Sequence, residues 1–143
     1  MQSARILVCE KTGSWAAALR RVLSSTQHRV RETRSLAECW RELEQGPASL
    51  VALELTRENG EALVRRLLDL SRCFPRARAI VLGRRVLEPF EGLVREAGAA
   101  HVLLSPRGVS GAARLIERHM AQAPREQLTF RQSIWSRLPW GNQ

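Results

Sequence analysis

The sequence lacks the features that mark several large classes of protein. Its 143 residues contain no apolar run near about 18 residues, so we expect no membrane-spanning segment. Three cysteines occur without a CxxC pair or a cluster with histidine, which argues against a disulfide framework and a zinc site. Neither GxGxxG nor a Walker A pattern is present, so no glycine-rich phosphate loop is expected. No Ser, His and Asp series has a nucleophile elbow, and we expect neither an enzyme nor a bound cofactor.

The composition that is present indicates one globular domain. Hydrophobic residues make up 44% of the chain and charged residues 26%, which is typical of soluble proteins. A chain of this length buries roughly two thirds of its unfolded surface, so it needs no disulfide or metal to fold. Only four apolar residues separate Arg5 from Glu10, too few for the core of a signal peptide, and we therefore expect a cytoplasmic protein.

The charge balance is basic, with 23 lysine and arginine residues against 14 acidic ones and a net charge of +9. Lys11 is the only lysine, and the arginines extend from Arg5 to Arg137. Such an excess favours phosphate backbones, but no aromatic stripe interleaves the arginines to stack on bases. We therefore favour a solvated basic surface and keep a nucleic-acid-associated regulator as the alternative. The densest cluster, at 65–85, contains Arg65, Arg66, Arg72, Arg76, Arg78, Arg84 and Arg85.

Short apolar runs alternate with segments of helical spacing along the chain. Amphipathic helices are expected to begin near Ser14, Ser35, Gly60, Pro89 and Ser110, and the first two serines are expected to act as N-caps. Parallel strands need crossover helices, so the alternation predicts an α/β protein with helices on both faces of a parallel sheet. The expected strands are 6–9, 29–33 (weak), 50–53, 79–82 and 102–104.

In such open sheets, binding sites form where the strands end at their carboxyl edge. Five residues of this chain fall there and form the predicted site. They are Glu10, Lys11, Glu54, Gly83 and Ser105.

Five segments, in order and with matching spacing, resemble the receiver domain of bacterial two-component response regulators. The resemblance covers roughly residues 4–122. It implies a flavodoxin-like (βα)5 sandwich whose five-stranded parallel sheet has the order 2-1-3-4-5. It also implies a domain over 1–123 followed by a tail over 124–143. The segments are Arg5–Glu10, Leu50–Leu55, Asn59–Leu63, Ala79–Gly83, and Glu96–Ala99 with Val102–Pro106.

The resemblance breaks down at the active-site positions. Receivers hold magnesium with two acidic residues after the first strand, and here these positions are Glu10 and Lys11. Their phosphoacceptor aspartate corresponds to Glu54, their serine or threonine to Gly83, and their lysine to Ser105. Two further departures concern neighbouring positions. The aromatic switch position of receivers falls at Val102, and the loop 55–59 is shorter than usual and lacks its proline.

These replacements predict a pseudo-receiver that is not phosphorylated and has no magnesium site. Magnesium requires oxygen ligands, and Lys11 removes one while adding a repelling charge. Glu54 carries its carboxylate one methylene further out, which in-line phosphoryl transfer tolerates poorly. Gly83 has no hydroxyl to donate, and Ser105 has no charge to neutralise a phosphoryl group.

Two interpretations of Lys11 remain open from the sequence. In one, its ammonium lies between the carboxylates of Glu10 and Glu54 and replaces the metal as an internal counter-ion. In the other, Lys11 points into solvent and pairs with nothing. Glu54 as a permanent mimic of the phosphorylated state is a weaker option, because one negative charge replaces nearly two.

The tail after Pro124 is too short for an output domain, and it is rich in apolar and arginine residues. Its apolar residues suit docking on a protein partner, packing on its own domain, or a membrane surface, and disorder is the remaining alternative. We expect a non-catalytic signalling module that binds a protein partner independently of phosphorylation. The predicted docking residues are Phe130, Ile134, Trp135, Leu138 and Trp140. By resemblance, a homodimer would use Glu91, Arg95, His101, Arg114 and Arg118.

Overall fold

The computed structural model describes residues 3–23 and 29–123, and the predicted docking residues of the tail lie outside these ranges. Within them, five strands alternate with helices as expected. The strands are β1 (Ile6–Cys9), β2 (Val30–Thr33), β3 (Leu50–Glu54), β4 (Arg78–Leu82) and β5 (His101–Leu103). The α-helices are α1 (Ser14–Val22), α2 (Leu36–Gln45), α3 (Gly60–Cys73), α4 (Glu91–Glu96) and α5 (Val109–Gln122). Two 3-10 helices, η1 (Arg85–Phe90) and η2 (Pro106–Gly108), precede α4 and α5.

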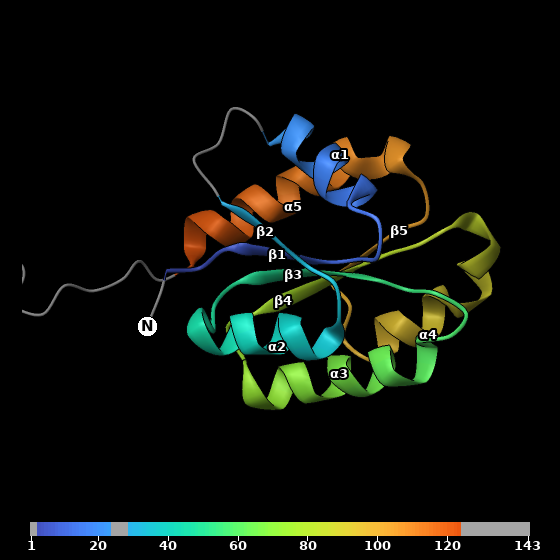
Figure 1. Cartoon of the computed structure of the whole chain (residues 1–143), viewed down its shortest axis with the longest axis horizontal. Coiled ribbons are helices and arrows are strands. Elements are labelled where there is room, and N and C mark those ends of the chain that lie inside the picture. Colours follow the sequence, from blue (N-terminus) through green and yellow to red (C-terminus); the bar gives the residue numbers. More distant parts are fainter. Residues whose placement is uncertain (1–2, 24–28, 124–143) are drawn as a thin grey trace, which may run out of the picture.

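The strands form one parallel sheet in the order β2-β1-β3-β4-β5, which confirms the predicted topology. Helices α1 and α5 cover one face and α2, α3 and α4 cover the other (Figure 1). Alternate residues of a strand therefore enter different cores: Leu7 packs beneath α2 and α3, whereas Ile6 and Val8 pack beneath α1 and α5. Because both faces of the sheet are covered, its strands are continuous apolar runs.

The two predicted serine caps have different outcomes. Ser35 caps α2 as predicted, and its hydroxyl accepts a hydrogen bond from the Glu38 N–H at 3.1 Å. The prediction for Ser14 is wrong, because Ser14 is the first residue of α1 and the N-cap is Gly13. Gly13 has a φ of 89°, a left-handed conformation that glycine adopts without steric cost. The first amides of α1 therefore need another acceptor.

The start of α4 also differs from the prediction. We expected Pro89 in the first turn of an α-helix, but it lies in η1, and α4 begins at Glu91. Proline has no N–H to donate, and a short 3-10 turn before the helix tolerates this. None of the helices in the described part of the chain is long and apolar enough to cross a membrane.

Two of the three cysteines and one histidine are buried in the described part of the chain. All three cysteines are free thiols. Burial raises the pKa of Cys9 and raises that of Cys39 to about 12, so both stay protonated near neutral pH. Burial also lowers the pKa of His119, whose Nε2 lies 2.7 Å from the carbonyl oxygen of Ala48. Cys9, Cys39 and His119 are therefore part of the buried interior, whereas Cys73 is exposed.

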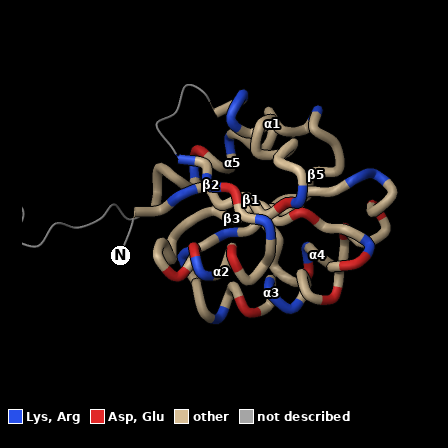
Figure 2. Tube along the Cα trace, viewed as in Figure 1, with Lys and Arg blue, Asp and Glu red and all other residues tan. Residues whose placement is uncertain are grey.

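The arginine cluster at 65–85 does not form a single face. Arg65 and Arg72 form ion pairs with acidic residues of their own helix, α3. Arg78 begins β4 and Arg84 follows its end, and a five-residue strand separates these positions by about 16 Å. Basic positions are distributed around the molecule and interspersed with acidic ones (Figure 2). This arrangement gives no support to the alternative of nucleic-acid binding through one arginine-rich face.

Candidate functional site

A cavity of about 740 Å³ lies at the carboxyl edge of the sheet, where the sequence predicted a site. Its walls come from the loops that follow β1, β3, β4 and β5, because parallel strands all end at this edge. Four of the five predicted residues line it. They are Lys11, Glu54, Gly83 and Ser105.

Glu10, the fifth predicted residue, is turned away from this cavity. Its side chain is only 2% exposed, and its two carboxylate oxygens accept the N–H groups of Trp15 at 2.9 Å and Ala16 at 2.6 Å. These are the second and third residues of α1, whose amides an N-cap side chain would otherwise bind. A carboxylate is well suited here because the N-terminus of a helix carries partial positive charge. Glu10 therefore caps α1 in place of Ser14.

Of the two interpretations left open for Lys11, the structure does not show the ammonium bridge. In the described ranges the Lys11 side chain is exposed and forms no ion pair with Glu10 or Glu54. Its backbone N–H, and not its ammonium, donates to Glu54 Oε1 at 3.3 Å. The Glu10 carboxylate binds the α1 amides instead of the Lys11 ammonium, although Glu10, Lys11 and Glu54 line one smaller cavity of about 240 Å³.

The loop after β3 is held by reciprocal hydrogen bonds. The Thr56 N–H donates to Asn59 Oδ1 at 2.8 Å, and the Asn59 N–H donates to Thr56 Oγ1 at 3.2 Å. The side-chain NH₂ group of Asn59 also donates to the backbone carbonyl oxygen of Glu54 at 2.7 Å. Hydrogen bonds from its own backbone and from Thr56 lower the pKa of Glu58, and the charges of Lys11 and Arg57 act in the same direction. The loop therefore has a defined conformation at the cavity wall.

Gly83 and Ser105 bring no charged side chain to the cavity. Gly83 has no left-handed φ, and a Cβ added there would lie 3.4 Å from Leu87 Cδ1, an ordinary contact. The backbone therefore does not require glycine at this position, and a residue with a side chain would fit there. The Ser105 hydroxyl accepts from the Arg107 N–H at 3.3 Å, so it caps η2 and brings no positive charge to the cavity.

Sequence reasoning missed three cationic side chains at this site. Arg57 follows β3, and Arg84 and Arg85 follow β4, and all three line the cavity. The carboxyl-edge rule that found Glu54 and Gly83 applies equally to these neighbours.

A magnesium ion does not fit this arrangement. Both oxygens of Glu10 already accept backbone N–H groups, and Lys11 stands where a second carboxylate would be needed. In the part of the chain that the structure describes, no three His, Cys, Asp or Glu side chains are grouped to hold a metal. The cavity wall carries four cations against two carboxylates, which favours anions over cations.

Several solved structures have the same fold, and their names describe response regulators, a CheY-like protein and a putative pilus assembly protein. A response regulator from Thermotoga maritima matches with a TM-score of 0.71 and 17% identity, covering 84% of this chain and 99% of that one. A CheY-like protein (tadZ) from Pseudomonas aeruginosa matches with a TM-score of 0.68 and 18% identity over 82% and 99%. A putative pilus assembly protein (cpaE) from Burkholderia thailandensis has a TM-score of 0.55 and 22% identity over 83% and 99%.

These similarities establish the class of fold. The chain has the fold of CheY-like receiver domains, as its sequence resemblance implied. No protein-family model matches the sequence, and no curated protein matches it either.

Proposed function

We propose that this chain is a non-catalytic, receiver-like signalling module that binds a protein partner without being phosphorylated. The observation that carries the proposal is the use of Glu10. A receiver needs an acidic side chain at this place to hold magnesium, and here both oxygens of the carboxylate cap α1. The residue has a structural role, and the module has one resting conformation.

The rest of the cavity supports the same conclusion. Phosphoryl transfer depends almost entirely on positioning and on electrostatic stabilisation of the transferred group. Glu54 differs from the usual acceptor by one methylene and is held by the Lys11 N–H. Gly83 and Ser105 supply neither a hydroxyl nor a cation to a phosphoryl group on Glu54. The chemical steps that switch a receiver therefore have no matching side chains at these positions.

Mass spectrometry tests the chemical part of the proposal. The full chain is incubated with acetyl phosphate and Mg²⁺ and its intact mass is recorded, with Glu54→Gln treated in parallel. We expect both proteins to keep their unmodified mass, because no magnesium site orients the donor. A stable phosphoryl adduct on the natural chain that is absent from Glu54→Gln would contradict the proposal.

The partner part of the proposal assigns 1–123 to the receiver-like domain and 124–143 to a docking tail. The apolar and arginine residues of this tail are typical interface anchors. The binding partner is sought by pull-down with the full chain and with a chain ending at residue 123, each with and without acetyl phosphate. We expect binding that is insensitive to the phosphodonor and lost on truncation, while circular dichroism reports an unchanged fold. Binding that appears only with the phosphodonor, or that survives truncation, would contradict the proposal.

A further inference from the structure

We infer that the cavity at the carboxyl edge of the sheet binds a phosphate-bearing small molecule non-covalently. The inference rests on the proposed function, since it concerns an input to a module that cannot be phosphorylated. The ligand class is a phosphate or diphosphate group joined to a partly apolar organic body. The charge, the polar residues and the apolar residues of the cavity wall fit such a ligand.

The first support is a group of cations that form no close ion pair, although the charges of Lys11 and Arg57 act on the Glu58 carboxyl. The side chains of Lys11, Arg57, Arg84 and Arg85 all line the cavity. Within residues 3–23 and 29–123, none of the four forms an ion pair or a side-chain hydrogen bond. Other arginines of the described chain, Arg20 for example, form ion pairs with carboxylates. Unpaired guanidinium groups beside a cavity are suited to phosphate because their planar N–H donors match its oxygens.

The second support is that the two carboxylates of the cavity have other partners. Glu54 accepts the backbone N–H of Lys11. Glu58 accepts hydrogen bonds from its own backbone and from Thr56, which hold the pKa of its carboxyl below the usual value. Neither carboxylate forms an ion pair with the four cations in the described ranges, so positive charge dominates the cavity wall.

The third support is the composition of the remaining wall. Three hydroxyl-bearing residues, Thr12, Ser14 and Ser105, line the cavity. The hydroxyls of Thr12 and Ser14 lie 3.1 Å apart and share a hydrogen bond, and that of Ser105 accepts the Arg107 N–H. Apolar side chains complete it, and one of them, Val86, is 56% exposed. A volume of about 740 Å³ lies within the range of small-molecule sites. The other apolar residues of the wall are Trp15, Leu55, Leu87, Leu104 and Pro106.

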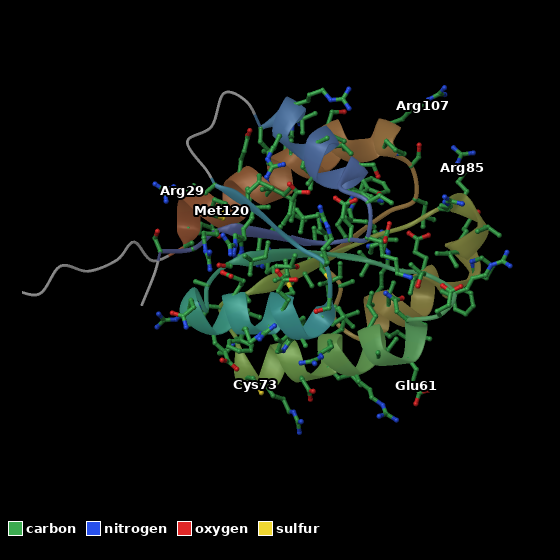
Figure 3. All side chains as sticks on the ribbon, in the orientation of Figure 1. Arg29, Glu61, Cys73, Arg85, Arg107 and Met120 are labelled. Carbon is green, nitrogen blue, oxygen red and sulfur yellow. The ribbon has the colours of Figure 1, made fainter. Side chains whose placement is uncertain are left out.

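The view of the side chains shows that this end of the molecule is accessible. Arg85 extends into solvent at the same end as Arg107, while Met120 and Arg29 lie at the opposite end (Figure 3). Arg85 begins η1, two residues after β4 ends, and it lines the cavity together with Arg84. The cavity wall therefore combines basic and apolar residues.

Titration calorimetry tests the inference with defined probes. The full chain is titrated with ADP, with inorganic pyrophosphate and with adenosine, all in the presence of EDTA so that no metal contributes. We expect saturable binding of one ADP per chain, weaker binding of pyrophosphate, and no measurable binding of adenosine. The difference between ADP and adenosine measures recognition of the phosphates, and the difference between ADP and pyrophosphate measures the apolar wall.

A pair of double variants locates the binding. Arg84→Gln with Arg85→Gln is expected to weaken ADP binding about tenfold or more, equivalent to about 1.4 kcal/mol. The control is Arg41→Gln with Arg76→Gln, two exposed arginines that lie outside the cavity and have no ion pair in the described chain. It removes the same net charge and is expected to leave the affinity unchanged.

Three results would overturn the inference. One is the absence of saturable binding of ADP and pyrophosphate. Another is an equal loss of affinity in both double variants, which would assign the binding to overall charge. The third is displacement of ADP by a DNA duplex, together with an affinity for that duplex that falls equally in both double variants. None of these results depends on phosphorylation of Glu54. The binding test and the mass-spectrometric test of the proposed function can therefore fail independently of each other.

Discussion

Replacing Leu67 by alanine is expected to lower the free energy of unfolding by about 2–5 kcal/mol. Leu67 lies on α3, is 1% exposed, and belongs to the core between the sheet and helices α2, α3 and α4. Alanine would leave a cavity that a close-packed interior refills only in part. Because the total stability of such a domain is about 5–15 kcal/mol, this loss is a large fraction of it. Urea unfolding followed by circular dichroism measures the change.

The next residue of the chain provides the matched control. Leu68 is 52% exposed on the outer side of α3, and Leu68→Ala changes the same side chain in the same helix. Its expected effect lies within about 0.5 kcal/mol. Equal effects of Leu67→Ala and Leu68→Ala would contradict the orientation of α3. This orientation matters for the cavity, because α3 begins directly after the loop that carries Arg57 and Glu58.

Replacing Glu10 by glutamine is expected to cost about 1–3 kcal/mol of unfolding free energy, although the side chain keeps its size. The carboxylate accepts the N–H groups of Trp15 and Ala16 through two different oxygens. Glutamine offers only one oxygen, so its NH₂ group would face a backbone N–H and leave it unsatisfied. The loss of charge also removes a favourable interaction with the N-terminus of α1. Chemical unfolding at neutral pH measures the effect.

Two further variants define the role of Glu10. Glu10→Asp keeps the charge but shortens the side chain, so we expect it to be destabilising as well, because the carboxylate no longer reaches both amides. Glu44→Gln removes a charge from an exposed glutamate of α2 that forms no ion pair in the described chain, and its expected effect is within about 0.5 kcal/mol. Unchanged stability of Glu10→Gln would show that the carboxylate does not cap α1.

Glu10 and Ser14 show how much of the site could be predicted from local patterns. A serine before an apolar helical repeat is a good N-cap candidate, and this rule succeeded at Ser35. It failed at Ser14 because a carboxylate four residues earlier in the chain reaches the same amides from the end of β1. The spacing along the chain left two interpretations of Lys11 open, and the bridge between carboxylates needed a Glu10 side chain that was not already bound to the α1 amides.

The arginines of the cavity illustrate a second limit. Arg57, Arg84 and Arg85 come from two loops that are distant in sequence and meet only at the sheet edge. Counting charges along the chain grouped Arg84 and Arg85 with Arg78, which lies at the other end of β4. The net charge of a segment therefore did not reveal which cations face one cavity.

The order of strands and helices, the parallel sheet and the positions near its carboxyl edge followed from the amino-acid pattern alone. These features could be predicted because apolar periodicity is a local property of the sequence, and because crossover connections allow few arrangements of parallel strands. The partners of Glu10 and Lys11 and the gathering of four cations around one cavity depended on three-dimensional packing. Hydrogen bonds and electrostatic forces act over a few ångströms in space, and spacing along the chain does not specify those distances.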